Sequence, residues 1–329
     1  MTTRPLAGHT VNPIGLGCMN LSHAYGTPPD ETSAIQLLQR AVELGCNHFD
    51  TATLYGFGAN ETLVGKALKP YRKQIFLASK CGMGGVNGKR VIDGRPATLK
   101  QQCEASLQRL QTDVIDLYYL HRWDKNIPIE ESVGALADLV QQGKIRAIGL
   151  SEVSAATLEK AHAVHPIAAV QTEYSLWTRN PEIAVLAKTR ELGAAFVAFS
   201  PLGRGFLGGS LHDVADLVEK DIRRPMPRFS AENYPKNLQL LTALQQLADQ
   251  AGCTLTQLSL AWLLAQQDNI LPIPGTVQIS HLAENLAAAE LNLDADLLQQ
   301  AGQLIHAQNV HGARYPAATQ AEIDTEEFA

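Results

Sequence analysis

The feature that most constrains the fold is an eightfold alternation of short apolar segments with amphipathic helical segments. In 30–44, for example, apolar residues recur at the three- and four-residue spacing of a helix. The predicted strands are 14–17, 47–50, 75–80, 114–121, 145–150, 168–171, 194–199 and 270–273, and the predicted helices are 30–44, 60–68, 98–110, 130–142, 155–164, 181–192, 255–267 and 279–289. Strands joined through helices run parallel, and eight of them close most economically into a barrel. The pattern therefore predicts an α/β fold, a (β/α)8 TIM barrel.

The rival arrangement is an open, doubly wound sheet, which usually has a glycine-rich phosphate turn after its first strand. The segment Gly15-Leu16-Gly17-Cys18 lacks the third glycine of that turn. Three segments fall outside the alternation: 3–11 is predicted to form a β-hairpin closing the barrel floor, 204–235 a long functional loop, and 310–329 a loosely held polar tail. We expect a single domain over 1–329.

Composition excludes several classes of protein. The chain is 45% hydrophobic and 18% charged, which provides apolar mass for a large core. The formal net charge of -6 argues against nucleic acid or anionic membranes as partners. The five cysteines are scattered and form no CxxC or Cys/His cluster, so no metal site is predicted. Without an apolar run of about 18 residues, a cytoplasmic protein acting on small molecules is expected.

Four ionisable residues follow predicted strands: Asp50, Tyr55, Lys80 and His121. Side chains at the carboxyl ends of parallel barrel strands meet at one mouth. A lysine ammonium within hydrogen-bond reach of a tyrosine favours the phenolate and lowers the tyrosine pKa, and an aspartate keeps the lysine charged. A histidine opposite them could orient a carbonyl. Together these groups could protonate an oxygen while a hydride from a bound cofactor attacks the carbon.

Taken singly, each of these residues could have a purely structural role, such as capping a helix, packing in the core or, for a lysine, extending to water. Two other functions also remain open. A desolvated Lys80 could form a Schiff base in a lyase or aldolase, although Asp50 would keep it protonated and non-nucleophilic. The chain could also be a nicotinamide-binding sensor or subunit with vestigial activity.

The region from about residue 10 to 300 resembles the aldo-keto reductase superfamily, in particular its bacterial branch with short loops. The resemblance rests on Phe49-Asp50-Thr51-Ala52 with Tyr55-Gly56, on Asp113 to Arg122, on Ser200 to Gly205, and on Ile273-Pro274-Gly275-Thr276. It implies a (β/α)8 barrel that interconverts aldehydes or ketones and alcohols with a nicotinamide cofactor. It also implies that Tyr55 is the general acid/base, that Lys80 and Asp50 tune it, and that His121 orients the carbonyl.

The resemblance also implies a cofactor site. Ser151 and Gln171 would hold the nicotinamide carboxamide and Phe199 would stack on the ring. The residues implied at the nicotinamide are Gly17, Cys18, Met19 and Asp50, with Glu152 at a position where asparagine is common. Those implied at the pyrophosphate are Ser200, Pro201, Leu202, Gly203, Arg204 and Gly205. The last helix would contribute Gly275, Thr276, Gln278 and His281, and the adenine would contact Glu284 and Asn285.

Two departures bear on the cofactor. The segment Thr276 to His281 carries no lysine or arginine to bind a 2′-phosphate, so phosphate binding would rest on Thr276, Ser280, His281 and helix amides. NADP(H) is therefore only modestly preferred, with NAD(H) as the alternative. Glu152 near the nicotinamide would favour the oxidised, positively charged ring unless that carboxylate is protonated or paired.

The substrate pocket is predicted to contain Tyr25, Tyr55, His121 and Trp123, with Trp177 and Phe206 contributing further apolar surface. These side chains suggest an apolar or ring-bearing carbonyl compound as the substrate.

Overall fold

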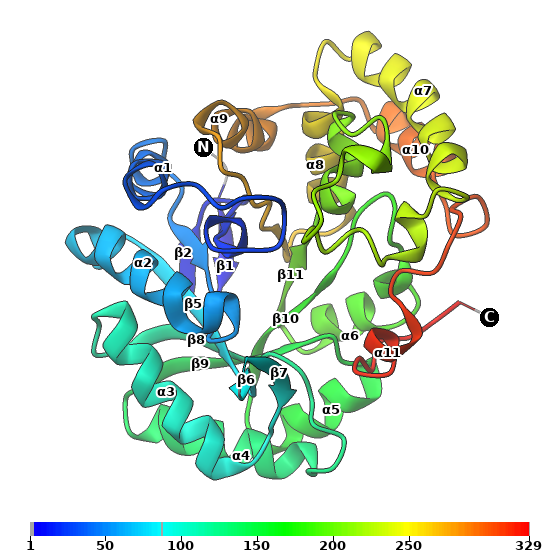
Figure 1. Cartoon of the computed structure of the whole chain (residues 1–329). Coiled ribbons are helices and arrows are strands. Elements are labelled where there is room, and N and C mark those ends of the chain that lie inside the picture. The colour runs from blue at the N-terminus through cyan, green and yellow to red at the C-terminus, as the bar shows by residue number, and fades with distance from the viewer. Residues whose placement is uncertain (1–2, 87, 329) are drawn as a thin grey trace.

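Eight parallel strands form one curled sheet at the centre of the molecule (Figure 1). The structure, a computed structural model, describes residues 3–86 and 88–328. The strands are β3 (Leu16–Gly17), β4 (His48–Asp50), β5 (Phe76–Cys81), β8 (Ile115–Leu120), β9 (Ile145–Ser151), β10 (Ile167–Glu173), β11 (Ala195–Phe199) and β12 (Ile270–Pro272). Their order in the sheet is β12-β11-β10-β9-β8-β5-β4-β3. Adjacent strands in the sheet are therefore consecutive barrel strands along the chain.

Backbone hydrogen bonds join the first strand to the last and close the sheet. The amide of Gly15 donates to the carbonyl of Pro272 at 3.0 Å, and that of Gly17 donates to Pro274 at 3.2 Å. The chains are so close here that a Cβ at Gly17 would lie 2.8 Å from the carbonyl oxygen of Ile273, which only glycine avoids. The predicted TIM barrel is therefore confirmed, and the open sheet is excluded.

Helices surround the sheet, as the apolar spacing predicted (Figure 1). The helices that follow barrel strands are α1 (Glu31–Glu43), α2 (Ala59–Leu68), α3 (Pro96–Leu110), α4 (Ile129–Gln141), α5 (Ala155–Val164), α6 (Val185–Glu191), α8 (Leu255–Gln266) and α9 (Ile279–Ala287). Helix α1 shows the local logic: the side chain of Asp30 accepts from the amide of Ser33 at 3.0 Å, and Leu37 and Leu38 are buried against the barrel.

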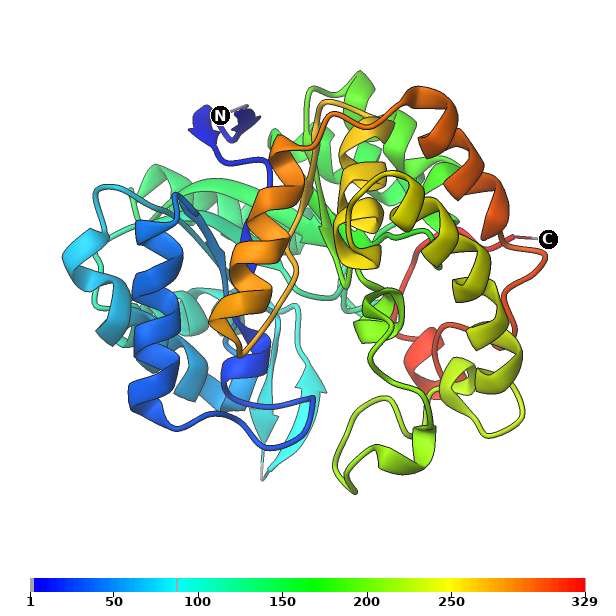
Figure 2. The same ribbon diagram turned by 90° about the horizontal axis from the view of Figure 1, so that it is seen from above.

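The N-terminal hairpin closes the barrel floor, as predicted. Strands β1 (Arg4–Leu6) and β2 (His9–Val11) pair antiparallel, and Leu6 and Val11 pack with apolar residues of the barrel interior. The guanidinium of Arg4 donates to the carbonyls of Gln267, at 2.8 Å, and Ile270. Figure 2 shows this hairpin at the end of the barrel opposite to the hairpin of β6 (Met83–Val86) and β7 (Lys89–Ile92), so the carboxyl ends of the strands remain open to ligands.

Several elements were not predicted from the sequence. They are the hairpin of β6 (Met83–Val86) and β7 (Lys89–Ile92), and helices α7 (Tyr234–Gln250), α10 (Ala295–Leu304) and α11 (Ala317–Gln320). The segment 204–230 contains only short 3-10 turns and irregular backbone, in keeping with the predicted long loop. Among the described residues, no helix is both long enough and apolar enough to cross a membrane.

The prediction of a loosely held tail is wrong. The carboxylate of Asp324 accepts from the hydroxyls of Ser154, at 2.9 Å, and Thr157, at 2.6 Å. Asn180 donates to the backbone carbonyl of Glu326 at 3.0 Å. Polar side chains that the sequence suggested were exposed to solvent therefore hold the tail across the mouth of the barrel through hydrogen bonds.

Candidate active site

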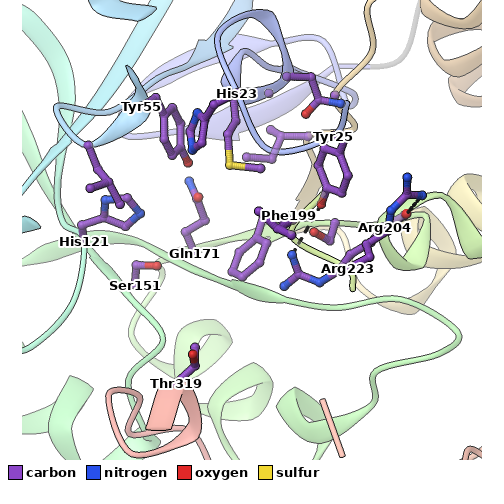
Figure 3. A pocket seen from close by; sticks show the side chains of 18 of the residues that line it. His23, Tyr25, Tyr55, His121, Ser151, Gln171, Phe199, Arg204, Arg223 and Thr319 are labelled. Carbon is purple, nitrogen blue, oxygen red and sulfur yellow. Dashed lines mark hydrogen bonds between the residues drawn. The ribbon is translucent and has the colours of Figure 1, made fainter. Parts of the chain in front are cut away.

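A cavity of about 540 Å³ opens at the carboxyl ends of the barrel strands (Figure 3). Asp50, Tyr55 and His121 line it, while Lys80 lies directly behind them with no exposed surface. The structure thus brings together the four ionisable residues that follow the strands.

Backbone contacts around strand β4 fix the position of Tyr55. The chain after Asp50 continues along β5, where the amide of Thr53 donates to the carbonyl of Lys80 at 3.1 Å. Asn60, at the start of α2, accepts from the hydroxyl of Thr51 at 2.6 Å and donates to the carbonyl of Cys18 at 2.8 Å. The loop that carries Tyr55 is therefore tied to both neighbouring strands.

Lys80 is the centre of the polar cluster. Its ammonium forms an ion pair with Asp50 and donates to the carbonyl of Thr51 at 2.9 Å and to the hydroxyl oxygen of Tyr55 at 3.1 Å. The second oxygen of Asp50 accepts from the side chain of Gln171 at 2.8 Å. All three ammonium donors have partners, so this buried charge is fully solvated by the protein.

Electrostatics assign a protonation state to each group. Burial lowers the pKa of Lys80, but Asp50 and Tyr55 outweigh it, so the net pKa of Lys80 is raised and the ammonium is retained. Burial raises the pKa of Tyr55, and the opposing effect of Lys80 is smaller. The expected acidification of Tyr55 by Lys80 is therefore present but does not dominate, and Tyr55 remains a neutral phenol that can donate a proton.

His121 faces Tyr55 across the same corner of the cavity. Their ring centroids are 5.8 Å apart with planes at 85°, so an edge of one ring meets the face of the other. Burial, with the positive charges of Lys80 and Arg122, lowers the pKa of His121 well below its usual value. The imidazole is consequently neutral, and a neutral imidazole can donate a hydrogen bond to a carbonyl oxygen without competing for its proton.

His23 is a site residue that the sequence reasoning missed. It lines the cavity, and its ring centroid lies 5.6 Å from that of Tyr55. The feature of the sequence that could have identified His23 is its position in the loop after the first barrel strand.

Cofactor residues predicted from the resemblance divide into two groups. Those that line the cavity are Gly17, Met19, Asp50, Ser151, Gln171, Phe199, Ser200, Leu202, Arg204, Gly205 and Gly275. Those that do not line it are Cys18, Glu152, Pro201, Gly203, Thr276, Gln278, His281, Glu284 and Asn285. Figure 3 shows Ser151, Gln171 and Phe199 on the same wall of the cavity.

Three features of these residues are compatible with a dinucleotide. Bare backbone lines the cavity beside the last strand, where a Cβ at Gly275 would meet the side chain of Asn20 at 2.8 Å. Farther along, the side-chain oxygen of Asn285 is buried and has no hydrogen-bond partner among the described residues. Between them, helix α9 begins at Ile279, and its N-cap residue Gln278 makes no side-chain cap hydrogen bond, which leaves the first amides of the helix available to an anion.

Arg204 is not a free cation for the pyrophosphate. Its guanidinium donates to Glu173 at 2.6 Å and to the hydroxyl oxygen of Tyr315 at 2.9 Å. Both members of the Arg204–Glu173 pair are almost fully buried. Arg204 therefore contributes shape and hydrogen bonds to the cavity wall, while its charge is balanced by Glu173.

Glu152 is also paired, with Arg314 of the tail. Its other oxygen accepts from the amide of Glu173 at 2.9 Å, and its backbone is left-handed with φ of 56°. Because Arg314 balances the carboxylate, Glu152 does not present an unpaired negative charge to the nicotinamide side. The same tail contributes Tyr315, Pro316 and Thr319 to the cavity, which the sequence did not indicate.

The predicted aromatic wall needs correction. Tyr25 lines the cavity, but Trp123 does not, and its indole N–H donates to the carbonyl of Ile127 at 2.9 Å. Trp177 and Phe206 stack on each other with centroids 4.0 Å apart inside the core. The loop after β11 instead supplies Ile222 and Met226 to the cavity, and Ile222 donates its amide to the carbonyl of Ala24 at 3.0 Å.

No group of three or more His, Cys, Asp or Glu side chains among residues 3–86 and 88–328 has the arrangement of a metal site. The cavity places a neutral phenol, that of Tyr55, beside a neutral imidazole, that of His121, and such groups can exchange a proton with an oxygen and orient it.

Sequence comparison identifies relatives of this arrangement. The model of the Aldo/keto reductase family matches residues 13–305. The chain is 43% identical over 328 residues to "Aldo-keto reductase yakc [NADP(+)]" of Schizosaccharomyces pombe, covering 98% of this chain and 96% of the relative. It is 43% identical over 310 residues to a probable aldo-keto reductase 1 of Glycine max, covering 94% and 89%.

Solved structures agree with the fold. A glycerol dehydrogenase from Gluconobacter oxydans superposes with a TM-score of 0.86 at 27% identity, covering 96% of this chain and 98% of the other. An aldo/keto reductase from Klebsiella pneumoniae, solved in complex with NADP and acetate, has a TM-score of 0.73 at 27% identity, covering 95% and 98%.

We predict that Glu152→Gln destabilises the protein strongly. It leaves Arg314 buried without its anion, which typically costs about 3–5 kcal/mol. Glu322→Gln, which breaks the more exposed pair with Arg90, is the matched control and is expected to cost less than about 1 kcal/mol. Urea unfolding of both variants measures the difference. Equal small losses of unfolding free energy in the two variants would show that the Glu152–Arg314 pair does not hold the tail.

Proposed function

This chain belongs to the aldo/keto reductase family, and we propose that it reduces an aldehyde or ketone to the alcohol with Tyr55 as the general acid. Family membership makes it an NAD(P)-dependent oxidoreductase. The observation that carries the finer proposal is the ammonium of Lys80, 3.1 Å from the hydroxyl oxygen of Tyr55, at the wall of a cavity that His121 also lines.

In this proposal each residue has one task. A bound nicotinamide cofactor supplies the hydride that reaches the carbonyl carbon. His121, as a neutral imidazole, positions the carbonyl oxygen next to the hydroxyl of Tyr55. Tyr55 gives its proton to that oxygen, and Lys80 stabilises the phenolate that remains. Asp50 keeps Lys80 charged and in place through both of its oxygens, one of which is held by Gln171.

We propose NADP(H) as the preferred cofactor. The fungal relative is named for NADP(+), and the Klebsiella pneumoniae structure contains NADP. In this chain the 2′-phosphate would rest on Thr276, Gln278 and His281 and on the first amides of α9. The nicotinamide would lie against Ser151, Gln171 and Phe199.

The alternatives gain no support from the geometry. A Schiff-base enzyme needs a neutral lysine, whereas Lys80 is fully buried in an ion pair and its pKa is raised. A nicotinamide-binding sensor would not need the proton donor, the oriented histidine and the open cavity in one place. Measurable turnover of a carbonyl substrate would exclude that sensor.

We predict that Tyr55→Phe removes turnover while cofactor binding persists. Loss of the proton donor should lower kcat by about 10²-fold to 10⁴-fold or more. Stopped-flow reduction of a carbonyl panel measures kcat, and quenching of protein fluorescence measures cofactor affinity. Tyr118→Phe, which removes a hydroxyl buried outside the cavity, is the control and should keep its turnover. Wild-type rates in Tyr55→Phe would end the assignment of the acid.

The protonation states predict the pH dependence. Reduction needs Tyr55 protonated, and burial raises its pKa above the usual 10, so kcat for reduction should be flat through neutral pH. It should fall only when pH rises through that raised pKa, while alcohol oxidation, which needs the phenolate, should rise over the same interval. Profiles of both directions from about pH 5 to 11 test this. A reductive limb falling near pH 7 would contradict a neutral, buried phenol.

We predict that His281→Ala weakens NADPH binding more than NADH binding. Loss of a polar contact to the 2′-phosphate should raise the Kd for NADPH about tenfold. Fluorescence titration with each cofactor measures the two changes. His9→Ala, at the opposite end of the barrel, controls for the loss of a histidine. Equal losses for both cofactors would count against a phosphate contact at His281.

A further inference from the structure

The charged residues that line the cavity are predominantly basic. Of the described residues on its wall, four are arginines (Arg90, Arg122, Arg204 and Arg223) and one is a carboxylate, Asp50. The chain as a whole carries a formal net charge of -6, so this cavity is a local exception. A concave site lined by one sign of charge attracts ligands of the other sign.

Most of these charges are balanced within the protein. Asp50 is neutralised by Lys80, Arg204 by Glu173 and Arg223 by Asp221. Arg90, at the mouth, forms an ion pair with Glu322 of the tail.

Arg122 is the exception. Its Nη1 donates to two neutral oxygens, the carbonyl of His121 at 2.7 Å and the hydroxyl of Ser151 at 3.2 Å. No carboxylate among residues 3–86 and 88–328 forms an ion pair with it, its Nη2 makes no hydrogen bond there, and its Nε is buried without a partner. A half-buried guanidinium with unused donors is electrostatically incomplete until it meets an anion.

The charge of Arg122 acts where the carbonyl would lie. Arg122 follows His121 directly in the chain, and Figure 3 shows Ser151, which accepts from Arg122, on the same side of the cavity as His121. The positive charges of Lys80, Arg122 and Arg90 all contribute to lowering the pKa of His121, which shows that they act on the same point. Since Asp50 offsets Lys80 and Glu322 offsets Arg90, the uncompensated positive charge at this point is that of Arg122.

We propose that this enzyme selects carbonyl compounds that also carry an anionic group, a carboxylate or a phosphate, which the free donors of Arg122 bind. The inference rests on the proposed function and adds its substrate class. The anion would lie a few atoms from the reacting carbonyl, because Arg122 and His121 are adjacent on one wall. Nη1 is occupied by His121 and Ser151 and Nε is buried, so the unused Nη2 is the donor that would bind an oxygen of this anion in a charge-assisted hydrogen bond. The expectation of an apolar, ring-bearing substrate relied on Tyr25, Trp123, Trp177 and Phe206, and of these four Tyr25 alone lines the cavity.

A different task for Arg122 is to orient Ser151 for the nicotinamide. That task would make cofactor affinity depend on Arg122 and would leave the enzyme indifferent to charge on the substrate. The two tasks therefore differ in which measured constant changes.

The experiment compares matched substrates that differ in charge. The first pair is 3-carboxybenzaldehyde and its methyl ester, and the second is glyceraldehyde 3-phosphate and glyceraldehyde. In the wild-type enzyme the kcat/KM of the anionic member should exceed that of its neutral partner in at least one pair, and the pair that shows the preference tells carboxylate from phosphate. Arg122→Met should reduce kcat/KM for the preferred anion by about 10-fold to 100-fold, mainly through KM, with little change for the neutral partner.

Controls separate this effect from loss of structure or of overall charge. Arg40→Met removes one exposed positive charge from helix α1, far from the cavity. It should leave the ratio of the anionic to the neutral kcat/KM unchanged in both substrate pairs. Arg122→Lys retains the charge without the forked donors and should recover part of the anion preference. A far-UV circular dichroism spectrum and an unfolding midpoint that match those of Arg40→Met show that Arg122→Met is folded.

The outcomes are distinguishable. Anion preference that disappears in Arg122→Met supports the inference. Reduction of the neutral substrates with no preference in either pair, or equal losses for both members together with weaker cofactor binding, would overturn it and leave the reductase function intact. If neither member of either pair is reduced, even with NADPH and NADH both supplied, the proposed function fails and this inference fails with it.

Discussion

The site depends on one buried ion pair, that of Lys80 with Asp50. A lysine with no exposed surface would normally lose its proton, because burial disfavours its charge. Asp50 prevents this, and the second oxygen of Asp50 is held by Gln171 from the opposite side of the barrel. The ammonium is thereby maintained 3.1 Å from the hydroxyl oxygen of Tyr55, where it would stabilise the phenolate that the proposed proton transfer leaves.

This arrangement is effective because its members lie on rigid elements. Asp50 and Lys80 end adjacent paired strands, and Gln171 lies on β10 across the barrel interior. Burial of Tyr55 raises its pKa, so the resting group is the neutral phenol, and in the proposed mechanism Lys80 acts on the phenolate that proton transfer leaves. A barrel strand positions such groups more closely than a loop can, since its backbone is fixed by hydrogen bonds on both sides.

The sequence predicted the barrel, its hairpin floor and the convergence of the four ionisable residues, because these follow from periodicity and from where parallel strands end. It did not predict what depends on distant partners. The tail reads as polar and solvated, yet Asp324 and Arg314 find partners more than 150 positions away. Trp177 and Phe206 are aromatic in any setting, and only the fold shows that they stack in the core rather than line the cavity. The sequence predicted that Lys80 lowers the pKa of Tyr55. The larger, opposite effect of burial on that pKa cannot be predicted from residue types.

The two halves of the cavity differ in how they are built. The inner half is made of strand ends, where Asp50 matches the charge of Lys80 and Glu173 matches that of Arg204. The outer half is made of the loop after β11, the hairpin β6–β7 and the tail, which are joined by ion pairs such as Arg90 with Glu322. Because the matched charges are already satisfied, they cannot discriminate among substrates by charge. Discrimination must come from a group with unused donors, and among the described residues that face the cavity Arg122 is the arginine in that condition. Our proposals thus place the orientation of the carbonyl and the choice of substrate on adjacent residues of one segment, His121 and Arg122.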